Sequence, residues 1–315
     1  MQILELILER ELDHQKKAVD ALMSALDGVY MIKPRISYEN PSFDRKELRL
    51  IHNLLDIQKG IRADYRGCRD DGDYLNLDVK METGTGKTYV YTQTIYEMHR
   101  KFGFNKFIIA VPSLSIKAGT SQFISDSYVK HHFSDDCGYN CDIELGVLES
   151  PKKKKKGFLA MPSAVRDYVT GSCQNTNKIY VLLVNMQLLT NGNMLTRSDY
   201  DYVVEGYYRP FDALKATKPI VIIDEPHRFS RDQKAYKAIA QELCPQMIIR
   251  FGATFPEISV GIGRNKTTFK DFNNLVYELN ACDSFNLNLI KGVAKEHFEP
   301  LSQKQEKVKL VTVVS

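Results

Sequence analysis

The chain has 315 residues, of which 43% are hydrophobic and 26% are charged, and its formal net charge is +4. This composition is that of a soluble globular protein, and the length allows one large domain or two ordinary ones. The acidic start Met1–Glu5 excludes the basic region of a signal peptide, and no apolar run approaches the length of a membrane span. Six cysteines in so long a chain exclude a disulfide scaffold, so we expect reduced thiols, a cytoplasmic location and no membrane partner. The mild positive charge permits nucleic-acid binding without requiring it.

Residues 1 to about 30 carry apolar side chains near helical spacing, and residues 46–58 of the charged stretch that follows also have a helical pattern. Five short apolar runs come next, each bounded by glycine, proline, asparagine or charged residues. They are Leu75–Met81, Phe107–Val111, Ile179–Val184, Ile220–Ile223 and Met247–Phe251. Continuous apolar runs suit strands buried on both faces of a parallel sheet, and helix-like segments between several of them suit βαβ crossovers. The sequence therefore predicts a three-layer α/β domain with a mostly parallel sheet.

The stretch from about residue 121 to residue 177 interrupts this alternation, and we interpret it as an insertion. It contains five consecutive lysines, Lys152–Lys156, whose mutual repulsion predicts a solvated surface loop. The alternative is a loop that contacts nucleic-acid phosphates.

The same stretch contains cysteines and histidines that could be taken for a metal site. They are His131, His132, Cys137, Cys141 and Cys173. Their single C-x3-C spacing lacks the second matching pair that is typical of zinc sites. We therefore favour free thiols and surface histidines over a metal cluster.

A glycine-rich motif directly follows the first apolar run and precedes a predicted helix from Tyr89 to Lys101. Residues 82–88 read Glu82, Thr83, Gly84, Thr85, Gly86, Lys87 and Thr88. The two glycines let the backbone curl so that its N–H groups point at one anion, and the helix N-terminus adds partial positive charge. We assign residues 83–88 to ATP binding, with Lys87 reaching the β- and γ-phosphates and the Thr88 hydroxyl ligating Mg²⁺. The strict motif begins with glycine where this chain has Met81, so a turn that merely joins strand to helix is the alternative.

A second motif supplies two carboxylates at the end of the fourth apolar run. Asp224 and Glu225 follow Ile223, and Pro226 and His227 come next. In a parallel sheet this end faces the same crevice as the phosphate loop. We expect Asp224 to hold Mg²⁺ through water and Glu225 to orient or deprotonate the attacking water. His227 is a candidate sensor of the γ-phosphate, although a lone histidine is more often structural.

After the fifth run, the small residues Gly252 and Ala253 precede Thr254. A turn there would let the Thr254 hydroxyl hydrogen-bond to His227 or Glu225, which would couple these residues to the phosphate site.

In this order, the motifs resemble the first motor domain of superfamily 2 helicases and translocases. Residues 82–88 are similar to helicase motif I, and Ala110–Ser113 to motif Ia, which touches the DNA backbone. Asp224–His227 resembles motif II, a DEAH-box relative with proline in third place. Residues 252–254 resemble motif III, usually Ser-Ala-Thr, with glycine in place of serine.

Within that superfamily the chain resembles the Res subunit of type III restriction enzymes. The run 79–91 is similar to that family's form of motif I, and Asp-Glu-Pro-His is its usual motif II. Residues 274–279 and 283–286 resemble the segment after motif III. Residues 12–19 resemble the element in which a glutamine reads adenine, which assigns that role to Gln15.

The resemblance implies a RecA-like P-loop NTPase fold and a large cytoplasmic protein with two motor domains and a C-terminal nuclease domain. It also implies ATP and Mg²⁺ as cofactors, double-stranded DNA as a partner and a methyltransferase (Mod) subunit that reads the recognition sequence. We divide the chain into a helical region (1–74), a first motor domain (75–285) and an exit segment toward a missing second motor domain (286–315). The arginine fingers of a second motor and a nuclease site are not found here, so a second chain could supply the missing motor. We expect this chain to bind Mg–ATP, hydrolyse it poorly and cut nothing.

Two other functions stay open. A non-catalytic module that holds ATP or DNA is the stronger, and a P-loop kinase is the weaker because no convincing arginine-rich lid is found. For DNA phosphates, the candidate contacts are Ser113, Ser115 and Lys117. The simpler alternative is that these residues only cap a helix after Pro112.

Overall fold

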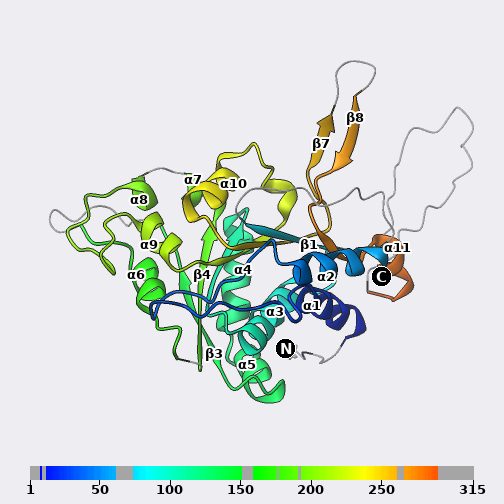
Figure 1. The fold of residues 1–315 in the computed structure, drawn as a ribbon, viewed down its shortest axis with the longest axis horizontal. Helices are drawn as coiled ribbons and strands as arrows, with labels where there is room; N and C mark the ends of the chain where they lie inside the picture. Colours follow the sequence, from blue (N-terminus) through cyan, green and yellow to red (C-terminus); the bar gives the residue numbers. More distant parts are fainter. Residues whose placement is uncertain are drawn as a thin grey trace, which may run out of the picture.

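A computed structural model describes residues 8, 12–61, 74–150, 159–175, 177–190, 193–260 and 266–289. Its centre is a seven-stranded sheet in the order β3-β4-β2-β5-β6-β1-β9, and every neighbouring pair is parallel (Figure 1). The strands are β1 (Leu75–Met81), β2 (Lys106–Val111), β3 (Asp142–Val147), β4 (Lys178–Asn185), β5 (Ile220–Asp224), β6 (Met247–Gly252) and β9 (Leu275–Leu279). The predicted parallel α/β sheet is thus confirmed.

The five apolar runs became the five central strands, and the two strands that the sequence pattern did not predict are the two edges. All residues of β2, β5 and β6 are buried, whereas β3 and β9 are only partly buried. An edge strand with one open side does not need a continuous apolar run, so its pattern is weaker. Because β3 pairs with β4, the stretch interpreted as an insertion supplies part of the sheet itself.

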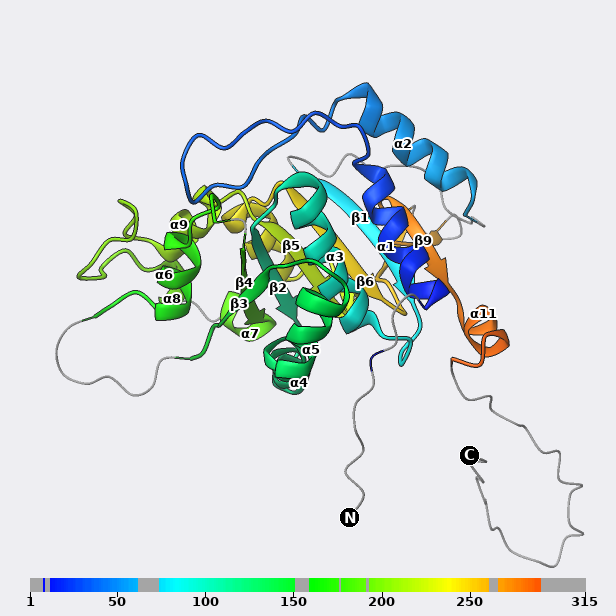
Figure 2. The ribbon, with the colours of Figure 1, turned by 90° about the horizontal axis from the view of Figure 1, so that it is seen from below.

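Helices cover both faces of this sheet, which makes the three layers. Alternate residues of each central strand contribute to two separate hydrophobic cores, as Ile109 and Ile108 of β2 do. On one face pack α1 (Asp13–Ala25), α2 (Leu48–Lys59), α3 (Lys87–Phe102), α4 (Leu114–Ser125) and α5 (Ser127–His131) (Figure 2). On the other pack α6 (Ser163–Thr170), α7 (Met186–Thr190), α8 (Asn193–Thr196), α9 (Pro210–Ala216) and α10 (Lys234–Lys237). Among the described helices, none is both long and apolar enough to cross a membrane.

The first helix of the chain is part of this domain. The described helix α1 is shorter than the predicted one, and residues 1–7 and 9–11 lie outside the described range. Ala18 and Leu22 of α1 are fully buried in the core that also contains Val90 of α3. Helix α2 agrees with the predicted span of 46–58.

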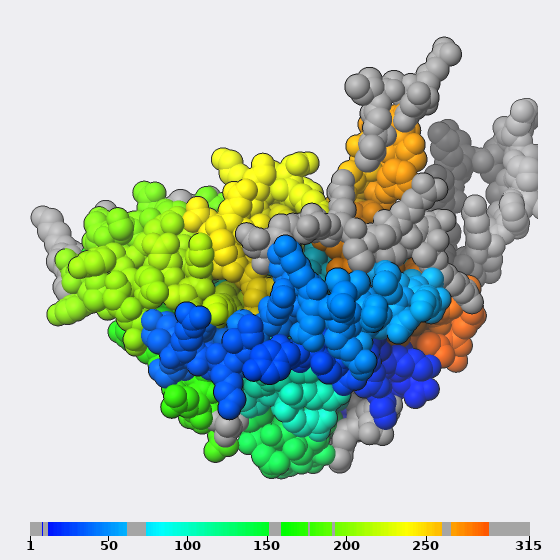
Figure 3. Space-filling model, in the orientation of Figure 1, coloured from blue at the N-terminus to red at the C-terminus, as the bar shows by residue number. Residues whose placement is uncertain are grey.

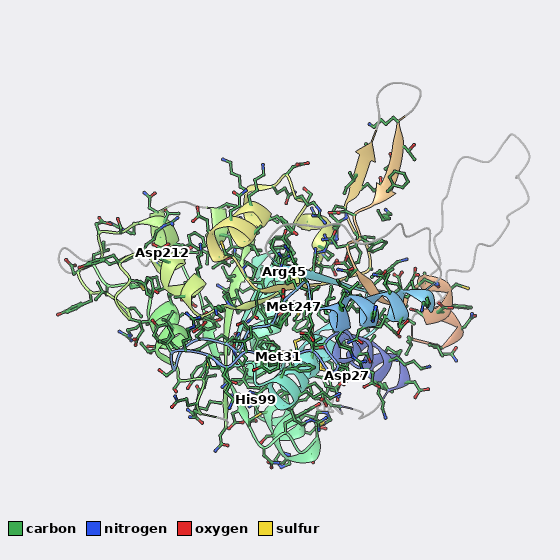
Figure 4. The ribbon with its side chains drawn as sticks, in the orientation of Figure 1. Asp27, Met31, Arg45, His99, Asp212 and Met247 are labelled. Atoms are coloured by element: carbon green, nitrogen blue, oxygen red, sulfur yellow. The ribbon has the colours of Figure 1, made fainter. Side chains whose placement is uncertain are left out.

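The segment between α1 and α2, residues 26–47, crosses the amino ends of the strands (Figure 2). Its contacts follow the order of the sheet. The Ser37 carbonyl accepts from Cys173 N–H before β4, Asn40 bonds at the starts of β2 and β5, and Arg45 donates to the Tyr74 carbonyl before β1. Figure 3 shows the segment and α2 as one blue band over the molecule, and Figure 4 shows Met31 and Arg45 on it.

A short antiparallel hairpin follows β6 and projects from the domain (Figure 1). It consists of β7 (Glu257–Val260) and β8 (Thr267–Lys270), and the last helix of the described residues is α11 (Ala281–Asn286). The lysine run at 152–156 and the segment 290–315 lie outside the described residues, so the predictions made for them stay predictions.

Candidate nucleotide-binding site

The phosphate loop lies at the carboxyl end of β1, where α3 begins. Gly84 and Gly86 have φ of 85° and 86°, a left-handed conformation that glycine adopts without steric penalty. Gly86 is the N-cap of α3, so Lys87 is the first residue of the helix and the free N–H groups of its first turn face the loop. This is the geometry that the glycine spacing predicted.

Helix α1 closes one side of the loop through two adjacent side chains. His14 Nε2 lies 3.0 Å from the Thr85 carbonyl, and Gln15 Nε2 donates to the same carbonyl at 3.5 Å. A side chain at Gly86 would overlap the end of the Gln15 amide and displace it, and the positive φ already favours glycine at this position. The Gln15 Oε1 atom is buried and has no partner among the described residues, which fits a residue that accepts a hydrogen bond from a base.

His14 is a site residue that the sequence reasoning missed. Its only sequence signal is that it precedes Gln15, because nothing in the periodicity of α1 distinguishes a residue turned toward the loop. Both residues are buried, at 6% and 7% exposure.

Strand β5 delivers the two carboxylates to the loop. Glu225 Oε1 lies 3.3 Å from Lys87 Nζ, and the two side chains are 19% and 9% exposed. Asp224 is buried, and its Oδ1 has no hydrogen-bond partner. Burial and the neighbouring Glu225 carboxylate raise the pKa of Asp224 to about 6, against the opposing effect of Lys87.

This donor set fits a magnesium–nucleotide complex. The unpartnered Asp224 oxygen and the hydroxyl of half-buried Thr88 are hard oxygen ligands, and the N–H groups with Lys87 form a cationic cradle. A bound cation would also relieve the repulsion that raises the Asp224 pKa.

A chain of contacts leads from the carboxylates to the turn after β6. His227 Nδ1 lies 3.3 Å from Glu225 Oε2 and hydrogen-bonds at 3.0 Å with Thr254 Oγ1. The predicted contact between Thr254 and His227 is therefore present. Gly252, Ala253 and Thr254 form that turn, so the phosphate loop, β5 and β6 are joined by side chains.

The three residues assigned to DNA phosphates are in different surroundings. Ser113 accepts from the Ile116 N–H at 3.3 Å and so caps α4, and its hydroxyl lies 3.0 Å from that of exposed Ser115. Lys117 is 7% exposed, and its ammonium donates to the Leu148 carbonyl at the end of β3. Burial lowers the pKa of Lys117. The structure corrects the surface role expected for Lys117, because its stem turns inward to join α4 to β3.

The cysteine and histidine group holds no metal site among the described residues. Cys137, Cys141 and Cys173 form no disulfide among the described residues, and Cys137 Sγ lies 3.6 Å from His132 Nε2. His132, expected at the surface, is 1% exposed and hydrogen-bonds with the Tyr89 hydroxyl at 2.9 Å. An aromatic cluster around Phe133 encloses it, which the spacing could not predict.

A parallel sheet with a glycine loop at one carboxyl end, a helix starting at the loop lysine and an acidic pair on a nearby strand define a P-loop NTPase domain. Comparison with known families is more specific. The family model described as "Type III restriction enzyme, res subunit" matches residues 10–257. The chain belongs to this family, which favours a motor protein over a P-loop kinase.

Curated relatives agree with this assignment. The chain is 41% identical over 292 residues to the Res subunit of the type III enzyme StyLTI of Salmonella typhimurium, covering 91% of this chain and 27% of the relative. It is 38% identical to the EcoPI Res subunit of Escherichia phage P1, covering 90% and 28%, and 37% identical to the EcoP15I Res subunit of Escherichia coli, covering 91% and 28%. The chain thus spans about a quarter of the length of these relatives.

Solved structures give more distant matches. The DNA-bound type ISP restriction-modification enzyme LlaBIII has a TM-score of 0.44 at 12% identity, covering 91% of this chain and 16% of that one. A nuclease-deletion mutant of the type ISP enzyme LlaGI has a TM-score of 0.41 at 12% identity, covering 70% and 19%. At these scores the likeness adds nothing to what the sheet topology already shows.

Proposed function

We propose that this chain is the first motor domain of a type III restriction translocase, which binds Mg–ATP and hydrolyses it in response to double-stranded DNA. The observation that carries the proposal is the continuous chain Lys87–Glu225–His227–Thr254. It joins the phosphate loop to the turn after β6, so a change at the γ-phosphate can reach a second segment of the domain.

Each residue of the site has a chemical task in this proposal. Lys87 and the loop N–H groups bind and orient the phosphates, and Thr88 and Asp224 would hold Mg²⁺, which neutralises phosphate charge when bound. Glu225 accepts the proton of the attacking water, for which it must leave its contact with Lys87. His227 contacts Glu225 and Thr254 contacts His227, so a movement of the Glu225 carboxylate would shift both residues. Gln15 selects adenine through its unpartnered oxygen.

Productive hydrolysis requires further parts. Arginines from a second motor domain, in the same chain or another, would stabilise the transition state. Ser113 and Ser115 are the remaining candidates for phosphate contacts, which position DNA and carry no sequence information. Sequence recognition would then come from a Mod subunit, and cleavage from a nuclease domain.

The test is ATP hydrolysis by the purified chain with and without duplex DNA, beside nucleotide binding by the Lys87→Ala variant. We expect DNA to stimulate turnover and Lys87→Ala to abolish nucleotide binding, because the cradle loses the side-chain cation that faces Glu225. Unchanged ATP affinity in Lys87→Ala would contradict the site assignment.

A non-catalytic nucleotide-binding module is the second candidate. The Lys87–Glu225 pair favours it, because a base held by the loop lysine is not free to accept a proton. Tight Mg–ATP binding without turnover, with or without DNA, would support this alternative.

A further inference from the structure

Gly252 lies against Pro226, and the two residues come from different motifs. A Cβ atom added to Gly252 would lie 2.9 Å from Pro226 Cγ and closer still to Cδ. It would also lie 3.2 Å from the Thr254 carbonyl. Real Cβ atoms do not approach carbon this closely, so even alanine at position 252 requires that the turn or the proline move.

Backbone conformation does not explain this glycine. Gly252 is the last residue of β6 and is not among the described residues with positive φ. Any residue could adopt its backbone, so the requirement for glycine arises from the proline ring. Pro226 in motif II and Gly252 in motif III are the two departures from the superfamily pattern, and they are therefore the two sides of one contact.

The proline also acts on its other neighbour, Glu225. Glu225 has φ of 55° and ψ of 64°, a left-handed conformation that a residue with a side chain rarely adopts. A residue before proline is further restricted, because the ring Cδ excludes much of the α region. The Glu225 N–H donates to the Phe251 carbonyl at 2.9 Å, directly beside Gly252. The strained residue is thus held by a bond to β6 and by a ring seated on Gly252.

We propose that Pro226 and Gly252 form a steric lock that positions the Glu225 carboxylate between Lys87 and His227. Both are positioning residues, since a proline ring and a glycine carry no side-chain group that can bind phosphate or move a proton. The proposal rests on the proposed function for its effect on turnover, but the lock itself is independent of hydrolysis. A larger residue at 252 pushes the ring away and releases Glu225, and loss of the ring at 226 releases it as well. Both changes together restore the contact, because the side chain added at 252 fills the space that the ring leaves.

Hydrogen exchange at the Glu225 amide tests the lock directly, because that N–H bonds to Phe251 beside the contact. Four proteins are compared in the full chain: the parent, Gly252→Ser, Pro226→Ala and the double variant. We expect Gly252→Ser and Pro226→Ala each to speed exchange, the first by about tenfold or more, and the double variant to return near the parent because its contact is filled again. Exchange unchanged in Gly252→Ser, or no recovery in the double variant, would overturn the lock.

Gly119→Ser is the matched control, since a Cβ at Gly119 meets no atom within 4 Å. It adds the same side chain in α4 and should leave exchange at Glu225 unchanged. An equal effect from Gly119→Ser would show that any added serine loosens the domain, and would also overturn the lock.

Turnover then tests the positioning role. We expect Gly252→Ser to lower kcat about tenfold with KM for ATP within about twofold, and the double variant to regain most of kcat, because only the base is displaced. A rise in KM with kcat unchanged would refute positioning of Glu225. If the parent hydrolyses no ATP, the proposed function fails, while the exchange pattern still decides whether the lock exists.

Discussion

Asn40 at the amino ends of the central sheet and the phosphate site at its carboxyl ends are built in opposite ways. At the amino ends, Asn40 is fully buried and its amide makes four hydrogen bonds: it donates to the Lys106 and Lys218 carbonyls and accepts from the Asn105 and Lys106 N–H groups. At the carboxyl ends, Asp224 and Gln15 each bury an oxygen without a partner, and Glu225 has a strained backbone. Polar groups satisfied within the chain stabilise the fold, whereas groups left unsatisfied are available to a ligand. The contrast predicts that substitutions at the amino ends will mainly lower stability and that substitutions at the carboxyl ends will mainly lower activity.

The largest effect is expected for Glu225→Gln at the carboxyl end. Loss of the base should lower DNA-stimulated turnover by about 10²–10⁴-fold with ATP affinity retained. Stability should change little, because the substitution removes both the repulsion of Asp224 and the ion pair with Lys87. Steady-state turnover, nucleotide titration and thermal unfolding measure the three quantities.

Glu278→Gln is the control, since Glu278 also pairs with a lysine, Lys80, at 20% exposure but lies on edge strand β9. It should leave turnover unchanged. Lost ATP binding in Glu225→Gln would mean that Glu225 is structural. It would contradict the assignment of activity, without stability, to the carboxyl ends.

At the amino end, Asn40→Ala should lower the free energy of unfolding by about 3 kcal/mol, because it leaves buried carbonyl and N–H groups unpaired. ATP affinity of the folded fraction should be unchanged. Urea denaturation measures the effect, and half-buried Asn53→Ala, which removes bonds to the Ala25 and Asp27 carbonyls, should cost less. Equal losses in both variants would show that the crossing segment is not a special source of stability.

The pH dependence of stability sharpens the comparison. The pKa of Asp224 is about 6 in the folded chain, against 3.8 for an unperturbed aspartate. The folded state therefore binds the proton more tightly than the unfolded state. The free energy of unfolding should therefore fall as pH rises through this window, by about 3 kcal/mol, and stay lower above it. Asp224→Asn should flatten that part of the profile in denaturation series at pH 4 to 7. If Asp224→Asn leaves the slope of the unfolding free energy against pH unchanged, that slope arises from other groups.

The smallest effect is expected for Gln15→Ala. It should weaken ATP binding by about fivefold, the value of one modest hydrogen bond, and leave binding of inorganic triphosphate unchanged. Parallel titrations with the two ligands separate base recognition from loop geometry. Weaker triphosphate binding would mean that Gln15 supports the loop through Thr85 instead of reading the base.

The predictable part of the fold and site depends on local patterns. The central strands were found because a strand covered by helices on both faces must be apolar at successive positions, as 107–111 and 220–223 are. The phosphate loop was found because Gly84 and Gly86 meet a conformational need that the sequence spacing expresses directly. Gln15 was assigned from a family resemblance, and the structure shows that it lies on the loop.

Other features arise only when distant segments meet. Edge strands β3 and β9 have weak patterns because each has a neighbour on one side only. The inward turn of Lys117 depends on where β3 ends, and the glycine at 252 depends on a proline 26 positions earlier in the chain. Periodicity and motif spacing report what a residue needs from its own backbone and burial. They carry no information on which side chain the fold brings against a residue, such as the Pro226 ring that lies against Gly252 beside Glu225.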